Sequence, residues 1–188
     1  MPWFFDVRSR KQSAAVVTPT ANLSMSWSPD GHYMAVGNKE DVVCIVDCRQ
    51  MKIMHKYPNK LQVNDPKWSQ DMRLFFQGNS TGELEVYRYP EMHRLRPLHG
   101  HTTAVFTIAV DKNSKYIATG GSDAVVSLWD AQDFVCLRTY IKMDHNIRGL
   151  SFSHDSRYLA IAAEQPALDI ENVETVEAKG AGALLAND

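Results

Sequence analysis

The chain has 188 residues, of which 44% are hydrophobic and 22% are charged, as is usual for a globular protein with its own core. A formal net charge of −2 argues against strong electrostatic attraction to nucleic acid or to an anionic membrane. Cys44, Cys48 and Cys136 lack the spacing of a disulfide framework or a zinc site, which indicates reduced thiols. Neither a signal peptide nor a run of about 20 apolar residues is found, so we expect an intracellular protein without a membrane partner.

One short pattern returns along the chain: a β-rich segment, a polar turn, and an apolar strand that ends in an acidic or polar residue. Its strand-end pairs are Phe5-Asp6, Val46-Asp47, Tyr87-Arg88, Trp129-Asp130 and Ile170-Glu171. Each pair follows the previous one by 41 or 42 residues. A period of roughly 40–45 residues with a Trp-Asp landmark is typical of the blades of a WD40 propeller.

This period divides the chain into units, taken here in order. Residues 1–17 hold a partial blade, and further blades are expected at about 22–56, 62–96, 103–140 and 146–177. We therefore predict an all-β fold, a partial WD40 β-propeller of about four four-stranded blades within residues 1–177. Residues 178–188 are rich in small side chains and drop the pattern, so we expect a disordered tail there, with a stretch foreign to the fold as the open alternative.

A polar turn recurs in register with the strand ends. It reads Trp27-Ser28-Pro29-Asp30-Gly31 in the first complete unit, and its counterparts are Trp68 to Met72, Val110 to Ser114 and Phe152 to Ser156. Asp, Asn, Ser, Pro and Gly each favour turns for their own reasons. The strand Val42 to Val46 is apolar at consecutive positions, which indicates cover on both faces, as in a blade between two neighbours.

The number of units raises the question of closure. Propellers have about 4–8 blades, so we expect the ring not to be closed by this chain alone. Three explanations stay open: a fragment of a larger propeller, a propeller completed by a partner, and a truncated product.

The unit at 103–140 carries the most specific local signal. Gly100-His101 precedes its first strand, and Thr119, Asp123 and Trp129 follow at positions that resemble the WD40 family pattern. That resemblance implies a structural hydrogen-bonded tetrad of His101, Thr119, Asp123 and Trp129. Val36 and Val46, and then Gln77 and Tyr87, occupy the matching places in the two preceding units, for which we predict packing alone.

No constellation points to catalysis. Gly78-Asn79-Ser80-Thr81-Gly82 matches the nucleophile-elbow pattern around Ser80, but an alternating strand follows it where a helix is needed, so a hairpin loop is the better interpretation. His99 and His101 lack further metal ligands in register. We predict that the protein is not an enzyme and has no catalytic residues, metal site, cofactor or small-molecule substrate.

Four longer stretches resemble the THO complex subunit 3 family of WD40 proteins. They are Trp27 to Gly31, Ala35 to Val43, Ser122 to Asp130 and Leu150 to Asp155. The similar region runs from about Trp3 to Glu177 and matches the C-terminal part of that family's propeller. The resemblance implies a nuclear scaffold that contacts other THO subunits in messenger RNA processing and export, with RNA reached at most indirectly.

Two alternatives stay open beside it. One is a WD40 adaptor in another pathway, such as a substrate receptor of a ubiquitin ligase. The other is direct RNA binding, which needs a basic face lined with aromatic side chains. The sequence leaves the partner-binding surface and the oligomeric state undetermined.

Overall fold

The computed structural model describes residues 3–174, and every regular element in that range is a β-strand. The strands are β1 (Trp3–Asp6), β2 (Lys11–Ala15), β3 (Asn22–Trp27), β4 (Tyr33–Asn38), β5 (Val42–Asp47), β6 (Lys52–Pro58), β7 (Val63–Trp68), β8 (Leu74–Asn79), β9 (Glu83–Arg88), β10 (His93–His99), β11 (Val105–Val110), β12 (Tyr116–Gly121), β13 (Val126–Asp130), β14 (Cys136–Tyr140), β15 (Ile147–Phe152), β16 (Tyr158–Ala163) and β17 (Leu168–Asn172). Over this range there is no helix that could cross a membrane. The predicted tail, residues 178–188, and the end of the fourth predicted unit lie outside the described residues.

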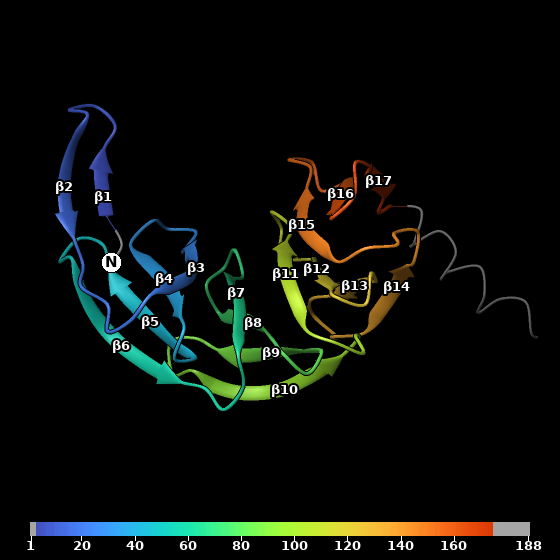
Figure 1. Cartoon of the computed structure of the whole chain (residues 1–188), viewed down its shortest axis with the longest axis horizontal. Coiled ribbons are helices and arrows are strands. Elements are labelled where there is room, and N and C mark those ends of the chain that lie inside the picture. The colour runs from blue at the N-terminus through green and yellow to red at the C-terminus, as the bar shows by residue number, and fades with distance from the viewer. Residues whose placement is uncertain (1–2, 175–188) are drawn as a thin grey trace, which may run out of the picture.

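The strands form five antiparallel meanders: the β1–β2 hairpin, three four-stranded sheets (β3–β6, β7–β10 and β11–β14), and the three-stranded sheet β15–β17. Figure 1 shows them following one another along an open arch, with β3, β7, β11 and β15 on its inner side and β6, β10 and β14 on its outer side. The all-β prediction is confirmed, and the four-stranded sheets have the form of WD40 blades. Between residues 3 and 174 the arch does not close into a ring (Figure 1).

Side-chain oxygens close the turn between the first two strands of each larger sheet. Ser28 Oγ donates to Asp30 Oδ1 at 2.6 Å and accepts the backbone N–H of Tyr33 at 2.9 Å. The same arrangement recurs through Ser69 with Asp71 and through Ser153 with Asp155. In the β11–β14 sheet Asp111 takes the place of the serine, and its own Oδ1 accepts the N–H of Tyr116 at 2.7 Å. The Ser-x-Asp pattern therefore recurs because the turn needs these acceptors.

The acidic strand ends have a similar local cause. Asp47 Oδ1 accepts the N–H groups of the second and third residues after it at 2.8 and 2.9 Å, and Asp130 does the same at 2.8 and 2.9 Å. The fourth residue after each of these strand ends has positive φ, for example 54° at Met51 and 56° at Phe134. Arg88 stands at this place in the β7–β10 sheet, and a guanidinium group cannot accept these hydrogen bonds.

The core consists of apolar layers between consecutive sheets. Val43 and Ile45 pack with Trp68 and Phe75 between the first two four-stranded sheets. Equivalent layers lie between β7–β10 and β11–β14, and between β11–β14 and β15–β17. Because β4, β5 and β12 are covered on both faces, they are buried at consecutive positions. Full burial of one such side chain contributes about 1.5–3 kcal/mol, so these layers hold the sheets in their relative places.

The two ends of the arch are covered less completely. Phe4 of β1 and Val16, which follows β2, pack against part of one face of β3–β6. On the same sheet Leu23, Met25 and Trp27 of β3 remain about half exposed. At the other end Leu168 and Ile170 of β17 are exposed.

Candidate functional site

A chain of hydrogen bonds crosses the β11–β14 sheet. Trp129 Nε1 on β13 donates to Thr119 Oγ1 on β12 at 3.0 Å, and His101 Nε2 lies 2.8 Å from the same oxygen. His101 Nδ1 lies 3.1 Å from Asp123 Oδ1. The structure thus brings together the four residues that the family pattern implies. The His101 side chain is only 1% exposed.

The chemistry of the groups assigns a direction to this chain. An indole N–H only donates, so Thr119 Oγ1 accepts from Trp129. If His101 carries its proton on Nδ1, it donates to the Asp123 carboxylate, and its Nε2 accepts the Thr119 hydroxyl proton. With a neutral imidazole, each side-chain donor of the tetrad therefore has an acceptor on a neighbouring member.

Asp123 anchors the outer end of the tetrad. Burial alone raises the pKa of its carboxyl, but hydrogen bonds from the Thr102 backbone and from His101 outweigh burial and lower the pKa below its usual value. Asp123 Oδ2 accepts the Thr102 N–H at 2.9 Å, and Oδ1 accepts the Val125 N–H at 3.2 Å. The carboxylate thus ties the turn after β12 to the segment that precedes β11.

Gly100 is required beside the tetrad for a steric reason. A Cβ atom at this position would lie 2.3 Å from Cζ2 of Trp129, closer than real Cβ contacts allow. The backbone before His101 therefore packs directly against the indole ring. Together these contacts rigidify the sheet and leave no reactive group free, which favours a structural role.

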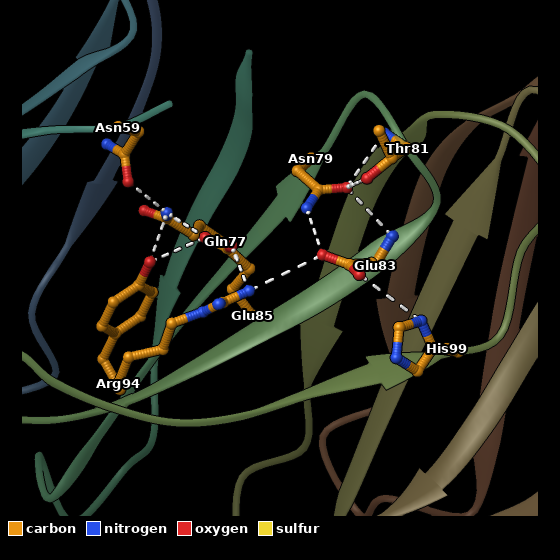
Figure 2. A network of polar contacts seen from close by, with 9 residues as sticks. Asn59, Gln77, Asn79, Thr81, Glu83, Glu85, Arg94 and His99 are labelled. Atoms are coloured by element: carbon orange, nitrogen blue, oxygen red, sulfur yellow. Dashed lines mark hydrogen bonds and ion pairs between the residues drawn. The ribbon is translucent and has the colours of Figure 1, made fainter. Parts of the chain in front are cut away.

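The β7–β10 sheet holds a second polar network, shown in Figure 2. Asn59, Gln77 and Tyr87 stand 42 residues before His101, Thr119 and Trp129, respectively. Gln77 Nε2 lies 2.7 Å from Asn59 Oδ1, 2.7 Å from Glu85 Oε2 and 3.1 Å from the Tyr87 hydroxyl. The Tyr87 hydroxyl donates to Glu85 Oε2 at 2.7 Å.

The prediction that this sheet relies on packing alone is wrong. Different side chains build a comparable buried chain at the same register, with an amide and a phenol in place of a hydroxyl and an indole. The 42-residue offset is the one sequence signal for this network, because Asn59 bears no chemical resemblance to His101. Burial is the main cause that raises the pKa of Tyr87, and the hydrogen bond to Glu85 raises it further. The Tyr87 hydroxyl therefore stays protonated and can donate.

The second network continues to the surface along β9 and β10. Arg94 Nη2 lies 2.8 Å from Glu85 Oε1 and 3.6 Å from Glu83 Oε2. Glu83 accepts from Asn79 Nδ2 at 2.9 Å, and the exposed His99 lies 3.5 Å from Glu83 (Figure 2). These contacts fasten the outer strand β10 to β9.

The remaining sequence candidates gain no reactive partner. Ser80 lies in the β8–β9 turn, where Asn79 Oδ1 accepts the N–H groups of Thr81 and Glu83 at 3.0 Å each, so the hairpin interpretation is confirmed. Across residues 3–174 no three His, Cys, Asp or Glu side chains gather as a metal ion would need. The cysteines of this range are free thiols.

One cavity combines apolar and charged walls. This inter-sheet groove lies between the β7–β10 and β11–β14 sheets and has a volume of about 610 Å³. Its apolar lining includes Leu74, Phe76, Leu95, Val110 and Phe134. Its polar lining includes Asp71, Arg73, Arg88, Glu91, Asn113 and Gln132. This volume lies within the range of about 300–1,000 Å³ that ligand sites occupy.

Comparison with known proteins identifies the repeat. The family model "WD domain, G-beta repeat" matches residues 92–130. THO complex subunit 3 of Arabidopsis thaliana is 37% identical over 171 residues, which cover 91% of this chain and 54% of that protein. WD repeat-containing protein AAC3 of Dictyostelium discoideum is 32% identical over 157 residues, covering 80% of this chain and 33% of that protein.

A third similarity is shorter. Subunit I of eukaryotic translation initiation factor 3 from Botryotinia fuckeliana is 36% identical over 101 residues, covering 53% of this chain and 29% of that protein. The chain therefore spans about half or less of the length of each of these relatives. Proteins with this repeat are typically non-catalytic scaffolds.

Proposed function

This chain is a WD40-repeat protein, and from that premise we propose that it is a non-catalytic scaffold subunit of the THO complex. One observation carries the proposal: the similarity to THO complex subunit 3 extends over 91% of the chain at 37% identity. The similarities to AAC3 and to the initiation factor subunit cover 80% and 53% of the chain.

The geometry supports binding in preference to catalysis. At the buried centre of each polar network the group able to transfer a proton is held by hydrogen bonds: His101 by Thr119 and Asp123, and Glu85 by Gln77. Rigid sheets hold the turns at their ends in place, and such turns are where scaffold proteins present partner-binding side chains. The partners we propose are other THO subunits, bound through protein–protein contacts.

The corresponding cellular role is messenger RNA processing and export, and the corresponding location is the nucleus. RNA is reached indirectly in this proposal, because a net charge of −2 gives the chain little attraction for a phosphate backbone. Neither a membrane nor a small-molecule substrate has a part in it.

The test is affinity purification of the tagged full chain from nuclear extract treated with RNase, followed by mass spectrometry. We expect recovery of other THO subunits. A Gly100→Val variant, whose side chain would collide with Trp129, is the matched control and should recover none of them. Recovery of translation initiation factor 3 subunits, or of chaperones alone, would refute the assignment.

A further inference from the structure

The inter-sheet groove is formed entirely by two complete four-stranded sheets, so its shape does not depend on what covers the ends of the arch. Leu74, Leu95, Val110 and Phe134 line it and are only partly buried. The wall at Phe134 is fixed, because the Arg96 guanidinium lies 5.5 Å from the centre of its ring and donates to its carbonyl oxygen at 3.2 Å. An apolar side chain would thus find a preformed surface here.

Arg88 lies on the rim of this groove and is the residue that departs from the repeat. At the same place Asp47 and Asp130 close the following turn through their carboxylates, which Arg88 cannot do. Arg88 is exposed, and its guanidinium forms no ion pair with any residue between 3 and 174. Nothing in the local structure therefore requires a positive charge at this position.

Four charged side chains line the groove, Arg73 and Arg88 against Asp71 and Glu91, and of the two guanidinium groups only that of Arg88 lacks an ion pair within the described residues. Arg73 pairs through Nε with Asp71 at 2.6 Å, and its side chain is 83% exposed, so the outer edge of its guanidinium faces solvent. Asp71 also closes its own turn. Asn113 and Gln132 add neutral amides to the opposite wall, and Glu91 is the unpaired carboxylate within the described lining.

We propose that the inter-sheet groove binds an extended segment of a partner protein in which an acidic side chain stands beside apolar ones. The acidic group pairs with the Arg88 guanidinium, and planar pairing of this kind is among the stronger charge-assisted contacts. The apolar side chains lie on Leu74, Leu95 and Phe134. This inference concerns a binding surface and does not depend on which assembly contains the chain.

The test uses fluorescence anisotropy with the full chain and a labelled peptide, Gly-Ser-Leu-Asp-Phe-Gly-Ser. We expect saturable binding, and about tenfold weaker binding of the peptide that carries Asn in place of Asp, since a charged hydrogen-bond partner is worth about one decade. Arg88→Asp should weaken binding by at least the same factor. It places at residue 88 the residue found at 47 and 130, so the fold should tolerate it.

Two further variants test the sign and the place of the charge. Glu91→Gln removes a negative charge from the groove lining and should tighten binding of the acidic peptide. Arg49→Asp makes the same substitution as at Arg88 in an exposed turn of the β3–β6 sheet and should leave binding unchanged.

Absence of saturable binding, or binding that Arg88→Asp leaves intact while the circular dichroism spectrum is unaltered, would overturn the proposal. The same holds if Arg49→Asp weakens binding as much as Arg88→Asp does, because the effect would then reflect overall charge. None of these measurements involves THO subunits, so their failure would leave the assembly proposal standing.

Discussion

The indole N–H of Trp129 donates to the hydroxyl oxygen of Thr119 at 3.0 Å, and both residues are buried. This hydroxyl joins strand β13 to the segment before β11, because His101 meets the same oxygen from the other side. Water has little access to these atoms, so each group depends on the others for its hydrogen bonds.

Replacing Thr119 by Val should therefore destabilise the fold. Valine preserves the shape of the side chain but leaves the Trp129 N–H and His101 Nε2 without partners, and each unsatisfied buried group costs about 1–3 kcal/mol. Urea denaturation followed by tryptophan fluorescence measures the change in the free energy of unfolding. Thr139→Val is the matched control, because Thr139 is exposed, and a change there within about 0.5 kcal/mol is expected. Equal effects of the two substitutions would argue against the tetrad as a stabilising element.

Acid should destabilise the protein below about pH 4 through its turn and tetrad carboxylates. The folded-state pKa of Asp123 lies below the ordinary value of 3.8, and that of Asp71 is lowered to about 2. A depressed folded pKa adds stability that is present above pH 3.8 and is lost as the pH falls through the folded value. The measurement is the free energy of unfolding at intervals from pH 7 to pH 2.

In the same experiment Asp123→Asn should flatten the decline in stability below pH 4, because its carboxylate no longer titrates. Asp133→Asn serves as the control, since the Asp133 side chain is exposed and forms no hydrogen bond or ion pair with residues 3–174. An unchanged acid slope in Asp123→Asn would mean that its carboxylate contributes nothing to stability.

The network of the β7–β10 sheet should behave as one coupled unit. Gln77→Leu and Tyr87→Phe each remove a partner of the Glu85 carboxylate, and each should cost roughly 1–3 kcal/mol. Because they share that partner, the double variant should depart from additivity by about 0.5–3 kcal/mol. Gln77→Leu combined with Thr119→Val joins two networks without a common partner and should be additive. Strict additivity in both pairs would contradict the coupling.

Two glycines should respond differently to one added methyl group. At Gly100 the Cβ would lie 2.3 Å from Trp129, whereas at Gly149 the nearest atom, Cβ of Ala162, is 3.6 Å away. We expect Gly100→Ala to lower stability by about 1–3 kcal/mol through overpacking and Gly149→Ala to be nearly neutral. Thermal unfolding by circular dichroism compares them. A neutral Gly100→Ala would show that the indole can move aside at little cost.

Local chemistry was predictable from the sequence. The strand period of 41 or 42 residues and the Ser-x-Asp turns are short-range features, because a turn is closed by acceptors within a few residues. The all-β WD40 architecture followed from them and is confirmed. The network around Gln77 escaped prediction because Asn59, Glu85 and Arg94 match no motif. Its contacts form only when β8, β9 and β10 align and the β6–β7 loop brings Asn59 beside Gln77.

The sequence by itself thus determined the strands, their turns and the identity of the repeat, since these depend on side-chain alternation and on local hydrogen bonds. Only the tertiary structure decided which sheet faces are covered, how the buried polar groups pair, and where the inter-sheet groove places Arg88 beside apolar walls. Those properties arise from packing between strands distant along the chain, and one set of local patterns is compatible with many such packings.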